Sequence, residues 1–296
     1  MNRVGLGVKK REVAAVWPAP LRHASGTVHL LRRSPVAVIG AGLILAAALL
    51  AVAAGVIAPH NPVAQIAQPL LPPGRAYLAG TDELGRDEMS RLIYGARVSL
   101  YVGVLSVSIA LALGASSGVV AGFYGGWLDN ALMRAMDVLF SLPAIVLAIA
   151  ITSILGPSLT NAMIAIGIAA TPLFIRLTRG QVLAVKTEDF VEAARAVGNP
   201  HRRILLRHIL PNVVSPLIVQ ATLTIATAII AEASLSFLGL GQQPPDPSWG
   251  SMLNFAKNFI SQAPWMAVWP GLAICTIVLA FNLLGDGLRD VLDPRA

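Results

Sequence analysis

The residues with the clearest chemical potential are two histidines in a basic stretch and two acids inside apolar runs, namely His201, His208, Asp137 and Glu232. The histidines stand seven positions apart, and no cysteine or carboxylate accompanies them at metal-site spacing, so no metal centre is predicted. Acids inside apolar segments are candidates for function by default. We expect Asp137 to play a structural role, paired with Arg134 three residues before it, and Glu232 to play a functional one at the outer end of its helix.

Nucleotide chemistry and covalent catalysis have no support in the sequence. None of the four lysines, Lys9, Lys10, Lys186 and Lys257, follows a glycine, which excludes a Gly-Lys-Ser/Thr phosphate loop and ATP binding by that route. No nucleophile elbow or His-Glu-x-x-His pattern occurs either. The sequence therefore predicts no catalytic, cofactor-binding or metal-binding residue on this chain, and places any energy source on another subunit.

The composition is typical of an integral membrane protein. Hydrophobic residues make up 55% and charged residues only 12%, whereas a soluble domain carries about 25% charged residues. The net charge of +7 does not indicate nucleic-acid binding, because basic excess in a membrane protein sits in cytoplasmic segments and no basic stripe is interleaved with aromatic residues. The single cysteine, Cys275, lies in an apolar run and predicts packing rather than a disulfide.

Six apolar runs are long enough, or nearly so, for the ~20 residues that cross a bilayer as a helix. They cover 35–58, 99–122, 131–155, 159–175, 213–231 and 265–284, and the first is expected to remain as an anchor. Pro143 and Pro172 fall inside two of the runs and predict kinks. Gly114, Gly118 and Gly122 share one helix face, which favours close approach of another helix, although glycine is also ordinary in membrane helices.

The charges of the connecting segments predict the orientation. Seven basic residues and one acid precede the first run, and seven basic residues separate the fourth and fifth runs, so both segments are expected in the cytoplasm. The four arginines of 59–97 are matched by four acids, which fits an outer segment, and its stretch 81–97 predicts a capping helix. The predicted organisation is a cytoplasmic segment 1–34, a first span 35–58, an extracytoplasmic segment 59–97, a core of spans 98–290 containing an inner segment 187–210, and a cytoplasmic tail 291–296.

The inner segment 187–210 predicts two short helices joined at an angle. Thr187 is expected as the N-cap of the first helix, and Gly198-Asn199-Pro200 ends it. The second helix runs over about 201–209 and leads to Pro211. The first helix carries a narrow apolar stripe flanked by Glu192 and arginines, with the stripe formed by Phe190, Ala193, Ala194 and Val197. Such a helix can enter a groove on a partner or lie on anionic lipid, and the residues alone leave both open.

The same segment resembles the EAA loop of ABC-importer permeases, whose pattern is Glu-Ala-Ala, three residues, Gly, nine residues, an apolar position, any residue and Leu-Pro. The matching residues are Glu192, Ala193, Ala194, Gly198, Leu210 and Pro211. His208 occupies the apolar position, and His-Ile-Leu-Pro-Asn in that place is similar to the dipeptide/oligopeptide/nickel branch. Segments 78–87, 91–97, 231–239, 247–250 and 285–290 resemble the C-type subunit of that branch, whereas 1–33 resemble nothing that we can name.

The resemblance implies an all-α integral membrane protein of six transmembrane helices, a type I ABC-importer-like permease of the bacterial cytoplasmic (inner) membrane with a cytoplasmic coupling helix. It implies a heterodimer with a homologous second permease, two cytoplasmic ATPase subunits or domains that bring ATP and Mg, and an extracytoplasmic peptide-binding protein. Di- or oligopeptides are the implied substrates, with nickel or glutathione as alternatives. The implied ATPase-docking residues are Glu192, Ala193, Ala194, Arg195, Gly198, His208, Leu210 and Pro211, and the resemblance implies a place for the stretch 81–97 near the incoming substrate carrier. From its own position in an apolar run, Glu232 is expected near an outer gate.

Two rival classes are less well supported by the residues. An ion-coupled secondary transporter would carry inverted repeats and paired carboxylates at mid-membrane, and the sequence has neither. A membrane-embedded hydrolase would need a buried serine with a basic partner, whereas all five histidines fall outside the predicted spans.

Overall fold

The computed structural model describes residues 35–292, and within this range the chain is helical and has no strand, only an isolated bridge between Thr81 and Asp87. The elements are α2 (Pro35–Val52), α3 (Ala54–Ile57), α4 (Glu88–Tyr124), α5 (Gly126–Phe140), α6 (Ala144–Leu155), α7 (Leu159–Lys186), α8 (Asp189–Ala196), α9 (His201–Ile204), a π-helical turn η1 (Leu205–Ile209), α10 (Leu210–Phe237), α11 (Trp249–Ala256) and α12 (Trp265–Leu292). The predicted all-α fold class is confirmed.

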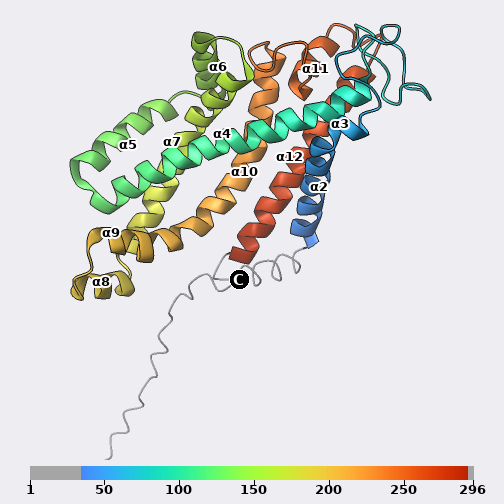
Figure 1. Ribbon diagram of the computed structural model, residues 1–296. Helices are drawn as coiled ribbons and strands as arrows, with labels where there is room; N and C mark the ends of the chain where they lie inside the picture. The colour runs from blue at the N-terminus through green and yellow to red at the C-terminus, as the bar shows by residue number, and fades with distance from the viewer. Residues whose placement is uncertain (1–34, 293–296) are drawn as a thin grey trace, which may run out of the picture.

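Five of the described helices are long and apolar enough to cross a membrane, and the count becomes six if the bent pair α5–α6 forms one span. This agrees with the six runs expected from the sequence. The ribbon in Figure 1 places α8, α9 and the end of α12 at one end of the bundle, and α11 with the segment 59–87 at the other. The two short-helix regions therefore lie at opposite ends of the long helices.

The third span is broken, contrary to the single run over 131–155. Helices α5 and α6 meet at 90° across Ser141–Pro143. Pro143 lacks a backbone N–H and holds an extended conformation, with ψ at 133°, so α5 ends before it and α6 begins after it. Pro143 thus produces a complete break, whereas Pro172 lies within α7, which continues to Lys186.

The outer segment also differs from the expected capping helix over 81–97. Residues Thr81 to Asp87 form a turn, and the helix begins only at Glu88. Asp87 caps it by accepting a hydrogen bond from the Ser90 backbone N–H at 3.0 Å. From Glu88 the helix continues without interruption to Tyr124, so the boundary expected at residue 97 falls inside α4.

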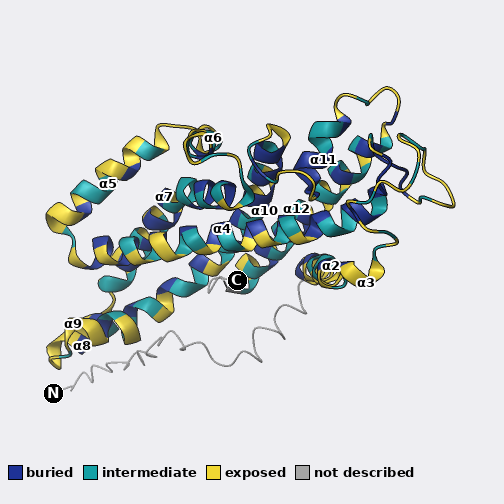
Figure 2. Cartoon of the chain, turned by 45° about the horizontal axis from the view of Figure 1, so that its top comes forward, coloured by how far each residue is buried: buried dark blue, intermediate teal, exposed yellow. Residues whose placement is uncertain are grey.

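Helix α4 is the central element of the bundle. It packs most extensively against α7 and also contacts α10, α2 and α12. Figure 2 shows buried residues concentrated along α4, α7 and α10, while α3, α5 and α8 carry many exposed ones. Small residues permit the closest contact: a Cβ added to Gly118 would lie 2.6 Å from the Ile175 carbonyl oxygen, and one added to Gly122 would lie 2.9 Å from the Val182 Cβ. The three glycines predicted to share a face, Gly114, Gly118 and Gly122, all lie against α7.

Candidate functional site

The inner segment forms an exposed elbow between α7 and α10. Glu188 stands at the N-cap of α8 without a side-chain cap, so the expected capping role of Thr187 is wrong. The helix ends at Ala196, and the chain turns at Gly198, whose φ of +80° favours glycine. The Asn199 side-chain amide donates to the Ala194 carbonyl at 3.0 Å and helps to satisfy the last turn. The predicted stop at Gly198-Asn199-Pro200 is where the chain turns.

The structure divides the predicted apolar stripe of α8 between a buried and an exposed side. Val191 and Ala194 face inward, whereas Ala193 and Val197 are exposed, Val197 by 83%. The reason is that Ile204 and Ile209, both buried, come back along η1 and pack in the same core cluster as Val191. The outward surface of the elbow, which we call the α8 face, therefore consists of small apolar residues flanked by charges: Glu192, Ala193, Arg195, Ala196 and Val197.

The remaining predicted docking residues lie around the return into α10. His208 is part of η1 and half-buried, Leu210 is the first residue of α10, and Pro211 is exposed just after it. Gly198 is also exposed, at the far end of α8. The structure thus groups Glu192, Ala193 and Arg195 on one surface and places His208, Leu210 and Pro211 at the base of the elbow, while Ala194 faces the core.

The elbow is anchored to the end of α4. The Lys186 ammonium donates to the Phe123 carbonyl at 2.6 Å, at the carboxyl end of α4, where a cation is favoured by the helix dipole. The His201 ring meets the Phe123 ring edge-on, with centroids 5.5 Å apart. Among residues 35–292 no group of three or more His, Cys, Asp or Glu could hold a metal ion. The contact that the structure gives His201 is the one with the Phe123 ring.

Two acids of α5 bind arginines of α7. Asp137 pairs with Arg176, not with Arg134 as expected from the sequence, because Arg176 from the neighbouring helix reaches the carboxylate across the α5–α7 contact. One turn further along α7, Arg179 forms a bidentate pair with Asp129, with Nη2 at 2.7 Å from Oδ2. Sequence reasoning missed the second pair, although the i, i+3 spacing of the two arginines indicates one shared helix face.

Glu232 is fully buried near the carboxyl end of α10. Its Oε1 accepts a hydrogen bond from the Ser236 hydroxyl at 2.6 Å, and Ser236 in turn accepts one from the Gln242 backbone N–H at 3.0 Å. Helix α11 packs on the same stretch, with Gly250 against the Ala233 backbone. The carboxylate is enclosed between α10 and α11, and its role at an outer gate stays a prediction.

The turn before α4 holds a buried cluster of charges. Arg86 binds both Asp82, at 2.5 Å, and Glu83, at 2.8 Å, and Arg91 lies 3.3 Å from Asp82. The side chains of Asp82, Arg86 and Arg91 are each no more than 5% exposed, so these charges are not part of a solvated surface. Burial raises the pKa of Glu83, and the neighbouring Asp82 carboxylate raises it further.

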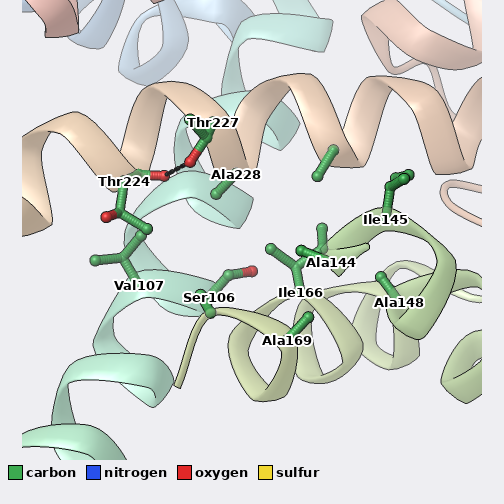
Figure 3. Close-up of a pocket in the computed structure, with 12 residues that line it drawn as sticks. Ser106, Val107, Ala144, Ile145, Ala148, Ile166, Ala169, Thr224, Thr227 and Ala228 are labelled. Atoms are coloured by element: carbon green, nitrogen blue, oxygen red, sulfur yellow. Dashed lines mark hydrogen bonds between the residues drawn. The ribbon is translucent and has the colours of Figure 1, made fainter. Parts of the chain in front are cut away.

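A cavity of about 110 Å³ lies inside the bundle, between α4, α6, α7 and α10. Figure 3 shows that the four helices contribute mainly small or apolar side chains, with the hydroxyls of Ser106, Thr224 and Thr227 among them. None of the residues that line this cavity is charged. Its position among α4, α6, α7 and α10 makes it the candidate for a path through the bundle.

Comparison with known proteins gives the class of this chain. Residues 110–296 match the family described as "Binding-protein-dependent transport system inner membrane component", and residues 26–73 match the "N-terminal TM domain of oligopeptide transport permease C". The fold and the exposed elbow define a multi-pass membrane permease. The chain belongs to this family of ABC-importer permeases, as a C-type subunit of the dipeptide/oligopeptide branch.

The curated relatives extend the match over most of the chain. The dipeptide transport system permease protein DppC of Alkalihalophilus pseudofirmus is 46% identical and covers 90% of this chain and 88% of its own length. DppC of Haemophilus influenzae is 44% identical, covering 88% and 90%. The glutathione transport system permease protein GsiD of Pectobacterium atrosepticum is 49% identical over 223 residues, 75% of this chain and 74% of that protein.

The solved structures show the same fold. A chain of the MetNI methionine ABC transporter, in an inward-facing conformation, matches with a TM-score of 0.56 at 23% identity and covers 69% of this chain and 97% of its own length. The helical architecture predicted from the sequence is therefore that of an ABC-importer permease.

Proposed function

We propose that this permease imports di- or oligopeptides and forms half of the pathway, with a homologous second permease supplying the other half. The observation that carries the coupling part of the proposal is the α8 face, an exposed surface at one end of the bundle that includes Glu192, Ala193 and Arg195. Identities of 46% and 44% to proteins named as dipeptide permeases favour the peptide substrate. ATP and Mg belong to partner ATPase subunits or domains, and an extracytoplasmic peptide-binding protein delivers the substrate.

The anchoring of the elbow supports a mechanical role for it. The α8 face is exposed on the surface of the protein, while Lys186 and His201 connect the same segment to the end of α4. A force applied to α8 by an ATPase would therefore reach α4 and α7 directly and tilt them as rigid bodies. Rigid-body movement of packed helices is an established way to alternate between inward-open and outward-open states.

The orientation of the elbow is part of the proposal and is tested by labelling. In a Cys275→Ala background, Val197→Cys places a thiol on the most exposed apolar residue of the α8 face. A membrane-impermeant maleimide should label it in inverted membrane vesicles and not in intact cells, and co-purification should recover two ATPases and a second permease. Labelling only from outside the cell would contradict the docking role.

Glutathione is the second candidate substrate, because glutathione permeases are 49% identical over 223 residues. Uptake of labelled dipeptide and labelled glutathione by the purified complete complex in proteoliposomes separates the two. We expect the dipeptide to be taken up faster. Faster uptake of glutathione would transfer the proposal to that substrate.

A further inference from the structure

Two buried serines of α4, Ser99 and Ser106, have hydroxyls without a hydrogen-bond partner among the described residues, and of these two only Ser106 lines the cavity. Hydroxyls inside membrane helices usually donate to the carbonyl one turn earlier, as Ser108 does to Val104 at 2.7 Å and Ser116 does to Ala112 at 2.7 Å. Ser106 is only 1% exposed, yet its Oγ has no hydrogen-bond partner among the described residues. A buried polar group in this condition is rare in folded proteins and requires an explanation.

The Ser106 hydroxyl belongs to the wall of the cavity between α4, α6, α7 and α10. Figure 3 shows it pointing from α4 into the space among the labelled residues. The other two hydroxyls of the wall are engaged on their own helix: Thr224 donates to the Gln220 carbonyl at 2.7 Å, and Thr227 donates to the Thr224 carbonyl at 2.9 Å. Ser106 is therefore the hydroxyl of this wall whose hydrogen-bonding capacity is unused.

The chemistry of the wall selects the kind of group that can bind. Alanines and branched aliphatic residues make up most of it, and no charged side chain lines it, so an ammonium or carboxylate would be placed there without a counter-charge. The volume, about 110 Å³, is smaller than the roughly 300–1,000 Å³ of a small-molecule site, so the cavity accepts one chemical group rather than a whole substrate. An uncharged amide satisfies both conditions, because it can donate to or accept from a hydroxyl.

We propose that Ser106 hydrogen-bonds a peptide group of the substrate as it passes along α4, and that this contact favours peptides over substrates without an amide. The inference rests on the proposed function and deepens it, since it assigns to this chain a substrate-contacting residue inside the bundle. The apolar wall around Ser106, including Ala148 and Ile166, accommodates the side chain next to that peptide group.

The first test measures uptake of labelled dialanine by the complete complex in proteoliposomes. Ser106→Ala should lower kcat/KM for uptake by roughly 2- to 10-fold, the effect of one lost hydrogen bond, without changing the basal ATPase rate or the yield of complex. Ser106→Thr, which keeps the hydroxyl, should restore most of the uptake. The matched control is Ser108→Ala, two residues away and exposed, which should behave as the wild type. Equal uptake by Ser106→Ala and the wild type would overturn the proposal.

The second test keeps the proposal falsifiable if Ser106→Ala assembles poorly. In a Cys275→Ala background, Ser106→Cys should react with a small methanethiosulfonate reagent during turnover, and dialanine should slow that reaction. Ser108→Cys should react at a rate that dialanine does not change. Absence of labelling at Ser106→Cys, or labelling that dialanine leaves unchanged, would overturn the contact. Failure of the wild-type complex to take up dialanine at all would instead contradict the proposed function.

Discussion

Individual charged residues in this protein mainly tie one segment to another. Asp129 binds Arg179 and Asp137 binds Arg176, which join α5 to α7. Asp82 binds Arg86 in the same way within the turn before α4. The sequence singled out Asp137, because this acid stands inside an apolar run, but not Asp129. It did not identify the correct partner of Asp137, because that partner lies on another helix and is set by the α5–α7 crossing rather than by spacing along the chain.

Glu83 gives a prediction at this scale. Burial is the main cause that raises its pKa above the ordinary value of 4.5, even beside Arg86. The folded protein thus holds this proton more tightly than the unfolded chain does. The stability from that proton is present below about pH 4.5 and is lost as the pH rises through the folded pKa. We expect the unfolding temperature of the wild-type complex to fall more between pH 5 and pH 8 than that of Glu83→Gln.

The control for the Glu83 prediction is Asp246→Asn, which removes an exposed carboxylate from the segment between α10 and α11. The pH dependence of its unfolding temperature should follow that of the wild type, because an exposed side chain contributes little to the packed structure. A Glu83→Gln profile parallel to that of the wild type would show that this carboxyl is ionised as readily in the folded protein as in the unfolded chain.

At the scale of helices, periodicity predicted which segments are helical but not how long they are or where they break. Helix α4 begins at Glu88, eleven residues before the predicted start of the second run at 99. It begins there because Asp87, in the buried turn, caps its first residues. The third run breaks at Pro143 into α5 and α6. A proline in an apolar run predicts a distortion, yet the 90° angle depends on how α6 packs against α7, which no local pattern contains.

The contact between α4 and α7 gives the prediction at the scale of helices. Gly118→Leu should reduce the yield of assembled complex and lower its stability by about 1–3 kcal/mol. A Cβ there would lie 2.6 Å from the Ile175 carbonyl oxygen, and this backbone atom cannot move aside as the end of a flexible side chain can. Size-exclusion yield and thermal unfolding of the purified complex measure the effect. The control is Gly42→Leu on α2, where an added Cβ meets nothing within 4 Å. Equal yields of both variants would contradict a close α4–α7 crossing.

At the scale of the whole molecule, the sequence predicted the bundle better than the surfaces it builds. Hydropathy is a property of one segment at a time, so the number of spans and the position of the inner elbow followed directly. The face that α8 presents depends on Ile204 and Ile209 returning beneath it, which leaves Ala194 in the core and Ala193 and Val197 exposed. The cavity was not predicted at all, because its wall combines residues as far apart in the chain as Ser106 and Ala231.

The transmission of force from the elbow to the bundle involves the whole molecule, and a single substitution on the α8 face can test it. Glu192 is exposed on the α8 face and contributes nothing to the packed core, so Glu192→Lys should leave insertion and complex stability unchanged. Reversing its charge at a docking surface should weaken or misplace an ATPase, because like charges across an interface are unfavourable. We expect peptide uptake by Glu192→Lys to fall at least several-fold, while the isolated permease pair keeps its normal yield.

The control for this variant is Asp290→Lys, which makes the same reversal at an exposed site near the end of α12, away from the elbow. Its uptake and substrate-stimulated ATPase activity should match the wild type.

Substitutions at Gly198 test the same surface in steps. Asn tolerates a φ of +80° better than a branched residue does, and an added Cβ meets nothing within 4 Å. Gly198→Asn should therefore transport better than Gly198→Val. If Glu192→Lys and Asp290→Lys transported equally well, force could not be entering the bundle through the α8 face, and the helices would have to be driven from another surface.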